Sequence, residues 1–401
     1  MAGLKYWVWL NECRGLTNRS RALLLDHFGS PEDVYYADEA EYALVEGLSK
    51  KQFELLADKS TDGADKILGD CQRLGLRILT MQDADYPARL RGIFEPPCLL
   101  YVKGTLPAFD EEVAVAMVGT RACTPYGTQS AEKIAYGLAK QGALVVSGAA
   151  RGIDSAAHRG ALRAGGVTVA VLGNGLDVVY PEENAGLYRD IAATGALLSE
   201  YPPGTAAEGW HFPIRNRIIS GLSVATVIVE AGNSRSGALI TARHAIDQGR
   251  GVYAVPGAIG AQQSKECNAL IEQGEASLLN DPKTLVREYG ALLRGGAGEY
   301  RSYVRQTVQP KTEKLRAVPK KTAAAPKKAA PPEKPAFALP EGLDEQETAL
   351  VRLVAEGIHS MEELVDRTGL PAPRLMCMVT SLEMEGVLER DAANVRLAGQ
   401  S

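Results

Sequence analysis

Two apolar runs that end in glycine-bearing turns decide the fold. The first is Val113-Ala114-Val115-Ala116-Met117-Val118-Gly119-Thr120-Arg121, and the second is Ala143-Leu144-Val145-Val146 followed by Ser147-Gly148-Ala149-Ala150-Arg151-Gly152-Ile153-Asp154. Short apolar runs without polar alternation predict strands buried on both faces, as in a parallel sheet covered by helices. Both turns would then lie at the carboxyl ends of their strands, where open α/β sheets bind ligands.

The same alternation of apolar run, turn and amphipathic segment continues along the chain to about residue 290. Further strands are predicted at Val167–Leu172, Ala196–Glu200, Val224–Glu230 and Gly251–Val255. Helices are predicted between the strands at Tyr126–Gln141, Asp154–Ala164, Pro181–Thr194 and Gly237–Gln248. The fold class is therefore α/β, with an extended Rossmann-like, doubly wound parallel sheet.

Two smaller domains and a linker are predicted around this sheet. Residues 1–80 contain short amphipathic segments and form a helical domain, in which Gly47-Leu48-Ser49 resembles the turn of helix-hairpin-helix or sterile-alpha-motif-like modules. Residues 81–294 form the Rossmann-like domain, and residues 295–340, rich in lysine, proline and alanine, form a linker. That linker is either a solvated spacer or a basic arm that attracts DNA.

Residues 341–401 are predicted to form a winged-helix domain, because three helical segments are followed by two short strand segments. The third helix carries Glu383 and Glu385, with Arg374 at its entrance. This charge pattern is unfavourable in a major groove and favours contact with a protein over contact with duplex DNA.

Composition excludes several classes of protein. The 401-residue chain has a net charge of -5, so a nucleic-acid site has to be a local basic patch. Its six cysteines form no C-x-x-C pair, and its histidines stand singly, which argues against a zinc site or a disulfide framework. The sequence shows neither a signal peptide nor a membrane span, which predicts a cytoplasmic protein.

The arginines on the glycine-bearing turns are the strongest candidates for an anion site. Arg121 and Arg151 stand among small residues, where guanidinium groups, backbone N–H groups and a helix N-terminus could bind phosphate together. Further along, Phe212 lies close to Arg215, Asn216 and Arg217 and is either a platform for stacking a base or a core residue. If this segment is helical, Arg215 and Arg217 point to different faces, so one would bind phosphate and the other a buried carboxylate. The candidate DNA contacts are Gly119, Thr120, Arg121, Ser147, Gly148, Arg151, Phe212, Arg215, Asn216 and Arg217.

Three patterns that suggest an enzyme are incomplete. Gly173-Asn174-Gly175 lacks the third glycine and the acidic residue of a dinucleotide-binding turn. The loop from Gly232 to Gly237 has the glycine spacing of a phosphate loop, but Ala238 and Leu239 follow where lysine and serine or threonine are required. Because no nucleophile and base are paired by motif either, the sequence predicts a protein that binds without catalysis, cofactor or metal.

Taken together, eight ordered motifs resemble the DNA-processing protein A (DprA, or Smf) family. They are Gly119-Thr120-Arg121, Ser147–Asp154 with Ala157-His158, Tyr180-Pro181-Glu182-Glu183-Asn184, Phe212–Ser223, Val229-Glu230-Ala231, Ser236–Ala242, Gly249–Gly257 and Asn268–Ile271. The resemblance implies single-stranded DNA binding in a basic pocket, loading of the RecA recombinase during transformation, and a homodimer through the Rossmann-like domain. Glu182 departs from the pattern, because some relatives carry a basic residue there, and it weakens the charge of the pocket.

Two other functions remain as alternatives. Nucleotide-cleaving enzymes of the lysine-decarboxylase-like (LOG) group have a related sheet, but they need a Pro-Gly-Gly-x-Gly-Thr-x-x-Glu turn where this chain has Glu230-Ala231-Gly232-Asn233-Ser234. A winged-helix regulator of duplex DNA is the second alternative. Release of ribose 5-phosphate would identify the first, and a preference for duplex over single strands would identify the second.

Overall fold

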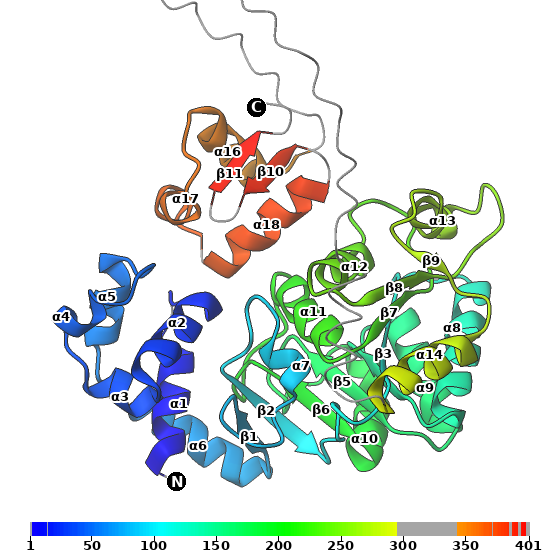
Figure 1. Ribbon diagram of the computed structural model, residues 1–401, viewed down its shortest axis with the longest axis horizontal. Helices are drawn as coiled ribbons and strands as arrows, with labels where there is room; N and C mark the ends of the chain where they lie inside the picture. The colour runs from blue at the N-terminus through cyan, green and yellow to red at the C-terminus, as the bar shows by residue number, and fades with distance from the viewer. Residues whose placement is uncertain are drawn as a thin grey trace, which may run out of the picture.

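Three parts of the protein are visible in the computed structural model, which describes residues 2–13, 15–294, 343–370, 372–384, 387–391 and 394–397 (Figure 1). A group of N-terminal helices and a C-terminal module flank a large α/β body. The expected linker at 295–340 lies outside the described residues.

A mixed sheet organises the α/β body. Among the described residues, nine strands form one sheet in the order β1-β2-β6-β5-β4-β3-β7-β8-β9. The strands from β3 onward pair in parallel, whereas β1 and β2 add an antiparallel edge. The strands are β1 Arg77–Thr80, β2 Leu99–Gly104, β3 Ala114–Val118, β4 Leu144–Ser147, β5 Thr168–Leu172, β6 Ala196–Ser199, β7 Ala225–Ile228, β8 Gly251–Ala254 and β9 Ser277–Leu278. The doubly wound parallel sheet predicted from the sequence is confirmed.

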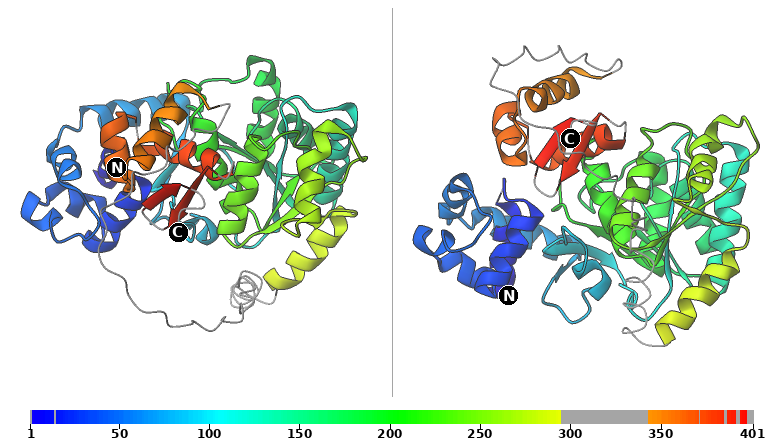
Figure 2. Two further views of the ribbon diagram at one scale, coloured as in Figure 1. Left: turned by 90° about the horizontal axis from the view of Figure 1, so that it is seen from above. Right: turned by 45° about the horizontal axis from the view of Figure 1, so that its top comes forward.

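Helices cover both faces of this sheet (Figure 2). On one face, α8 and α9 pack with α14 over β3, β4 and β7, and α10 continues this layer beside α9. On the other face, α11 and α12 bury their apolar residues against the same strands. The helices of the body are α7 Ala88–Arg91, α8 Pro125–Lys140, α9 Ile153–Arg163, α10 Ala185–Thr194, α11 His211–Gly221, α12 Gly237–Asp247, α13 Lys265–Glu272 and α14 Pro282–Arg294, with 3-10 turns at Glu182–Asn184 and Gln262–Ser264. Because the middle strands are covered on both sides, only the loops at their ends reach solvent.

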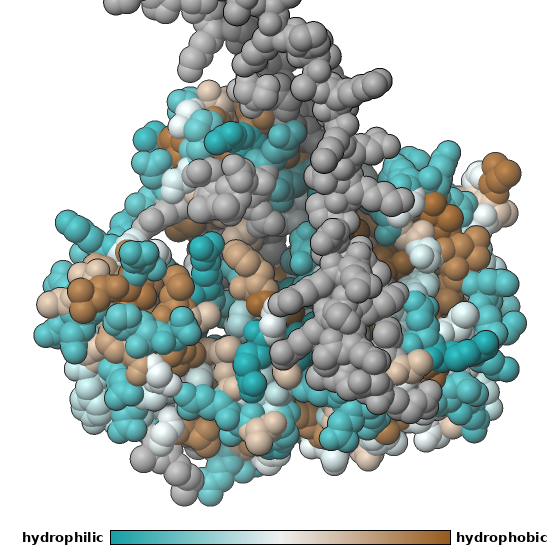
Figure 3. All heavy atoms as spheres, viewed as in Figure 1, coloured by the Kyte–Doolittle hydropathy of each residue, from teal (hydrophilic) through white to brown (hydrophobic). Residues whose placement is uncertain are grey.

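The N-terminal part is helical, as the sequence pattern predicts. Its helices are α1 Ala2–Glu12, α2 Asn18–Phe28, α3 Pro31–Tyr36, α4 Glu39–Tyr42, α5 Lys50–Ala57 and α6 Asp62–Leu74. Ser30 caps α3 by accepting a hydrogen bond from the Asp33 N–H, with Pro31 at the first helical position. On the face shown in Figure 3, apolar residues gather over this part, where Tyr36 and Leu44 are exposed. Strand β1 lies before residue 81, where the sequence analysis placed the beginning of the α/β domain, yet it pairs with β2 in the main sheet.

The C-terminal module has the expected order of a winged helix. Helices α16 Glu345–Ala355, α17 Met361–Thr368 and α18 Ala372–Met384 precede the antiparallel strands β10 Leu388–Asp391 and β11 Asn394–Leu397. Helix α18 lies against α11, and Met376 and Thr380 line a cleft together with Pro213 and Ile214. Asp366 on α17 pairs with Lys51 on α5. The third helix of the module therefore faces the rest of the protein.

No helix in the described part of the chain combines the length and the apolar character that crossing a membrane requires.

Candidate nucleic-acid interface

The turn after β3 places Arg121 at the carboxyl edge of the sheet. Gly119 is required there because a Cβ would lie 2.5 Å from Cγ1 of Ile153. The Thr120 N–H donates to the carbonyl of Glu230 at 2.8 Å, and the Glu230 carboxylate accepts hydrogen bonds from the backbone and hydroxyl of Thr124 at the start of α8. Buried Glu230 thus holds both ends of the turn, and the exposed Arg121 projects from it.

In the turn after β4, the carboxylate of Asp154 takes the place that the sequence analysis gave to a bound anion. The N–H groups of Gly148 and Ala150 both donate to Oδ2 of Asp154, at 3.2 and 3.4 Å. Burial raises the pKa of Asp154, while the nearby Arg215 guanidinium opposes that shift. These two backbone donors are consequently engaged, and the expectation that they meet a phosphate is wrong for this arrangement. The side chains are left as the candidate groups for binding a phosphate.

Gly152 closes this turn in a conformation that favours glycine. Its φ is +75°, and a Cβ would lie 2.4 Å from the carbonyl oxygen of Thr120. The neighbouring Ser147 is buried, and its hydroxyl donates to the carbonyl of Met117 at 2.6 Å. Both residues therefore bring the turns after β3 and β4 into contact.

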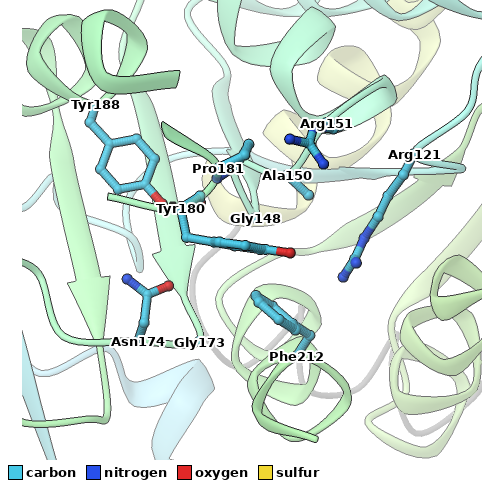
Figure 4. Close-up of a pocket in the computed structure, with 10 residues that line it drawn as sticks. All are labelled: Arg121, Gly148, Ala150, Arg151, Gly173, Asn174, Tyr180, Pro181, Tyr188 and Phe212. Carbon is cyan, nitrogen blue, oxygen red and sulfur yellow. Dashed lines mark hydrogen bonds between the residues drawn. The ribbon is translucent and has the colours of Figure 1, made fainter. Parts of the chain in front are cut away.

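Helix α11 supplies an aromatic ring between these turns. The Cζ atom of Arg121 lies 4.9 Å from the centre of the Phe212 ring, and Cζ of Arg215 lies 5.8 Å from it. The Tyr180 ring lies 5.6 Å from Phe212 at an interplanar angle of 31°. Figure 4 shows Arg121, Tyr180 and Phe212 converging on the same space. Phe212 is half-buried, and its role as a stacking platform stays a prediction.

The two arginines of α11 differ in their surroundings. Arg217 is buried, and its Nη2 donates to Oε1 of Glu200 at 2.7 Å, which confirms that one of the pair binds a buried carboxylate. Arg215 is buried as well, and its Nη1 donates to the carbonyl of Gly148 at 2.9 Å and to that of Val171. The expectation of an Arg215 open to phosphate is therefore wrong, because its guanidinium lies beneath the turn. Asn216 is also buried, and its Nδ2 donates to the carbonyl of Gly237 at 3.1 Å.

The pocket at this edge, called the stacking pocket below, contains residues that the sequence motifs did not single out. Gly173 contributes because a Cβ would lie 3.1 Å from the Phe212 ring. Tyr188 contributes a hydroxyl that donates to the carbonyl of Tyr180 at 2.7 Å, which supports the Tyr180 loop. The stacking pocket is lined by Arg121, Gly148, Ala150, Arg151, Gly173, Asn174, Tyr180, Pro181, Tyr188 and Phe212 (Figure 4). The signal for Gly173 and Asn174 was their place after a strand. Tyr180 belongs to a family motif that has no obvious chemistry, and Tyr188 lies outside the motifs.

Arg151 lies on the rim of the stacking pocket in an ion pair. Its Nε and Nη2 donate to the two carboxylate oxygens of Glu183, at 2.7 and 2.8 Å. The hydrogen bond from Arg151 lowers the pKa of Glu183. This carboxylate, which the sequence analysis did not single out, offsets one positive charge of the pocket.

Within the described residues, no group of three or more His, Cys, Asp or Glu side chains could hold a metal ion. The pocket is instead a basic and aromatic surface at the carboxyl edge of a parallel sheet. Such a surface can bind a phosphate by its arginines and a flat ring by Phe212.

Comparison with known proteins agrees with this class of fold. Residues 77–290 match the family of DNA recombination-mediator protein A, and residues 326–394 match the DprA winged helix domain. Protein Smf of Synechocystis is 32% identical over 390 residues, which cover 96% of each chain. DNA processing protein DprA of Streptococcus pneumoniae is 44% identical over 207 residues, which cover 52% of this chain and 72% of that relative.

The solved structure of the Streptococcus pneumoniae protein has a TM-score of 0.62 and 35% identity, and the match covers 71% of this chain and 97% of that chain. The chain belongs to the DNA recombination-mediator protein A (DprA/Smf) family.

Proposed function

We propose that this protein binds single-stranded DNA in the stacking pocket with little sequence preference. The observation that carries the proposal is the stack of Arg121, Phe212 and Tyr180 beside the rim arginine Arg151. A base can stack on an aromatic ring whatever its identity, and arginines can bind the flanking phosphates without reading base edges. This arrangement suits a single strand, because bases in a duplex are already stacked.

The candidate contacts divide into two roles in this proposal. Arg121, Arg151 and Phe212 touch DNA, and Gly119, Thr120 and Gly148 let the strand approach the turns. Ser147, Arg215, Asn216 and Arg217 act from beneath, because they are buried and hold the turns and α11 in place.

A titration of labelled oligonucleotides at several salt concentrations tests this proposal. We expect single strands of mixed and homopolymeric sequence to bind alike, with an affinity that falls steeply as salt rises. A preference for duplex DNA would contradict it and would favour the winged-helix alternative. Incubation with nucleoside monophosphates should release no ribose 5-phosphate, because the proposed role is binding without catalysis; release would favour the nucleotide-cleaving alternative.

The family resemblance extends the proposal to RecA. We propose that the protein protects incoming single strands and loads RecA onto them during natural transformation and recombination in the cytoplasm. The test is the lag before RecA hydrolyses ATP on single strands that are coated with a single-strand-binding protein. The lag should shorten when this protein is added, and an unchanged lag would contradict the loading role.

The proposed homodimer would form through the Rossmann-like domain. Fully exposed Ile259, in the loop before the 3-10 turn Gln262–Ser264, and exposed Leu278, on edge strand β9, supply apolar surface for it. Light scattering should give the mass of a dimer for the full chain and a lower mass for Ile259→Glu. A monomeric wild-type chain at micromolar concentration would contradict the proposed homodimer.

A further inference from the structure

The rim arginine of the stacking pocket is held by a carboxylate that would compete with DNA. Two of the five N–H donors of Arg151 point at Glu183, through Nε and Nη2. The side chains are 56% and 57% exposed, so the pair lies where a phosphate could reach it. A side-by-side carboxylate and guanidinium with two parallel hydrogen bonds has the geometry that arginine also uses for phosphate.

The backbone that carries Glu183 is fixed against the same turn as Arg151. Asn184, the next residue, is buried, and its Nδ2 donates to the carbonyl of Ala149 and to the hydroxyl of Ser155, both at 2.9 Å. Pro181, two residues before Glu183, is buried in the stacking pocket wall. Glu183 can therefore leave Arg151 only by rotating its side chain, and its charge stays near the pocket.

A phosphate meets this charge whichever edge of Arg151 it approaches. At the Nε–Nη2 edge it has to displace the Glu183 carboxylate. At the other edge, which presents Nη1, it would bind a guanidinium whose positive charge the paired Glu183 carboxylate already offsets. Arg121 is in a different situation, because its guanidinium lies over the Phe212 ring.

We propose that Glu183 is an affinity-setting residue of the DNA site, an internal competitor that occupies Arg151 until a phosphate replaces it. This inference rests on the proposed binding of single-stranded DNA. Arg121 and Phe212 provide the first contacts of the strand, and Arg151 joins when Glu183 turns away. The competitor keeps the affinity of the pocket below the value that its arginines alone would produce, which makes bound DNA easier to release.

The test compares Glu183→Gln with Glu182→Gln. Glu182 is exposed on the same 3-10 turn, so both variants remove one negative charge at nearly the same place. We expect Glu183→Gln to raise affinity for single-stranded DNA roughly two- to fivefold at moderate salt, because exposed ion pairs of this kind are weak. Its salt dependence should steepen by less than about 0.7, the contribution of one phosphate contact on a single strand, because Glu183 leaves the contact of Arg151 only partly formed in the wild type. Glu182→Gln should raise affinity by less and leave the salt dependence nearly unchanged.

A double-mutant cycle with Arg151→Met isolates the pair. In the Arg151→Met background, Glu183→Gln should lose its advantage over Glu182→Gln, and Arg151→Met should cost more affinity when Glu183 is already replaced. Equal gains from the two glutamine variants, or a loss of affinity in Glu183→Gln, would overturn the proposal; the loss would show that Glu183 positions Arg151 instead of competing for it. A wild-type chain that binds no single-stranded DNA would contradict the proposed function itself, which is a separate outcome. Thermal unfolding of each variant verifies that the fold is intact.

Discussion

The guanidinium of Arg215 fills the space that a side chain on Gly148 would need. A Cβ on Gly148 would lie 2.4 Å from Nη1 of Arg215, and the same Nη1 donates to the Gly148 carbonyl at 2.9 Å. This contact fixes the turn after β4 on top of α11, which also carries Phe212. Gly148 therefore connects the turn after β4 to the helix that carries Phe212.

Gly148→Ala should lower the free energy of unfolding by about 1 to 3 kcal/mol, because buried Arg215 has to shift away from two carbonyls. Chemical denaturation measures the loss. Gly186→Ala on α10 is the control, since its Cβ would meet nothing closer than 3.9 Å. That control should be neutral or slightly stabilising. Equal stability of Gly148→Ala and the wild type would show that Arg215 leaves room for a side chain at this position.

Arg121→Ala should weaken single-strand binding and reduce the salt dependence by about one counterion, because it removes one phosphate contact. Fluorescence anisotropy at several salt concentrations measures both quantities. A folded variant with unchanged affinity and unchanged salt dependence would exclude Arg121 from the site.

Phe212→Ala should reduce affinity by about 1 to 3 kcal/mol while leaving the salt dependence nearly unchanged, because stacking releases no counterions. The same titration separates this variant from Arg121→Ala by its salt dependence. Phe212→Tyr keeps an aromatic ring and should retain most of the affinity. Loss of thermal stability with normal affinity would instead assign Phe212 to the core.

The stability of the protein should depend on pH through His158. Its Nδ1–H donates to the Thr168 hydroxyl, which itself donates to the Val145 carbonyl, so Nε2 is left without a proton. Burial, with a smaller contribution from Arg215, lowers the pKa of His158 to about 3. The unfolded chain takes up this proton at a higher pH than the folded chain, so stability falls as the pH drops below about 6.5.

When the pH falls from 6.5 to 5, the contribution of His158 should lower the free energy of unfolding by about 2 kcal/mol. Denaturant titrations of the wild type and of His158→Asn at these two pH values measure the effect. The variant keeps a donor for Thr168 but cannot titrate, so it should lose less stability over the same range. Parallel losses in both proteins would show that other groups control this pH dependence.

Removal of residues 341–401 should change single-strand affinity by less than about threefold, because the arginines of the site lie in the α/β body. Met376 and Thr380 of α18 line the cleft beside α11, whereas the stacking pocket is lined by residues 121–212. Truncation should instead alter binding to a partner protein or to duplex DNA. If a truncated chain keeps its fold and oligomeric mass but loses single-strand binding, the assignment of the DNA site to the α/β body is wrong.

The repeating pattern of the sequence determined the architecture. Buried strands produce unbroken apolar runs, and helices that cover them produce amphipathic segments, so the parallel sheet and its ligand edge could be predicted from local patterns. Arg121 in the turn after β3 and the aromatic residue Phe212 were singled out for the same reason: a charged side chain on a tight turn, and a ring next to arginines in the sequence, are local features. The antiparallel strand β1 was missed, because its four residues, Arg77–Thr80, carry little pattern.

Only the tertiary structure decided which charged groups meet. Arg215 lies 67 residues from Gly148, and Arg151 lies 32 residues from Glu183, so neither contact follows from periodicity or from a motif. Packing of α11 under the turn buried Arg215 and made it a support, and the fixed 3-10 turn at Glu182–Asn184 brought a carboxylate to Arg151. A local pattern predicts the burial of apolar side chains, whereas the burial and the partner of a charged side chain depend on the path of the whole chain.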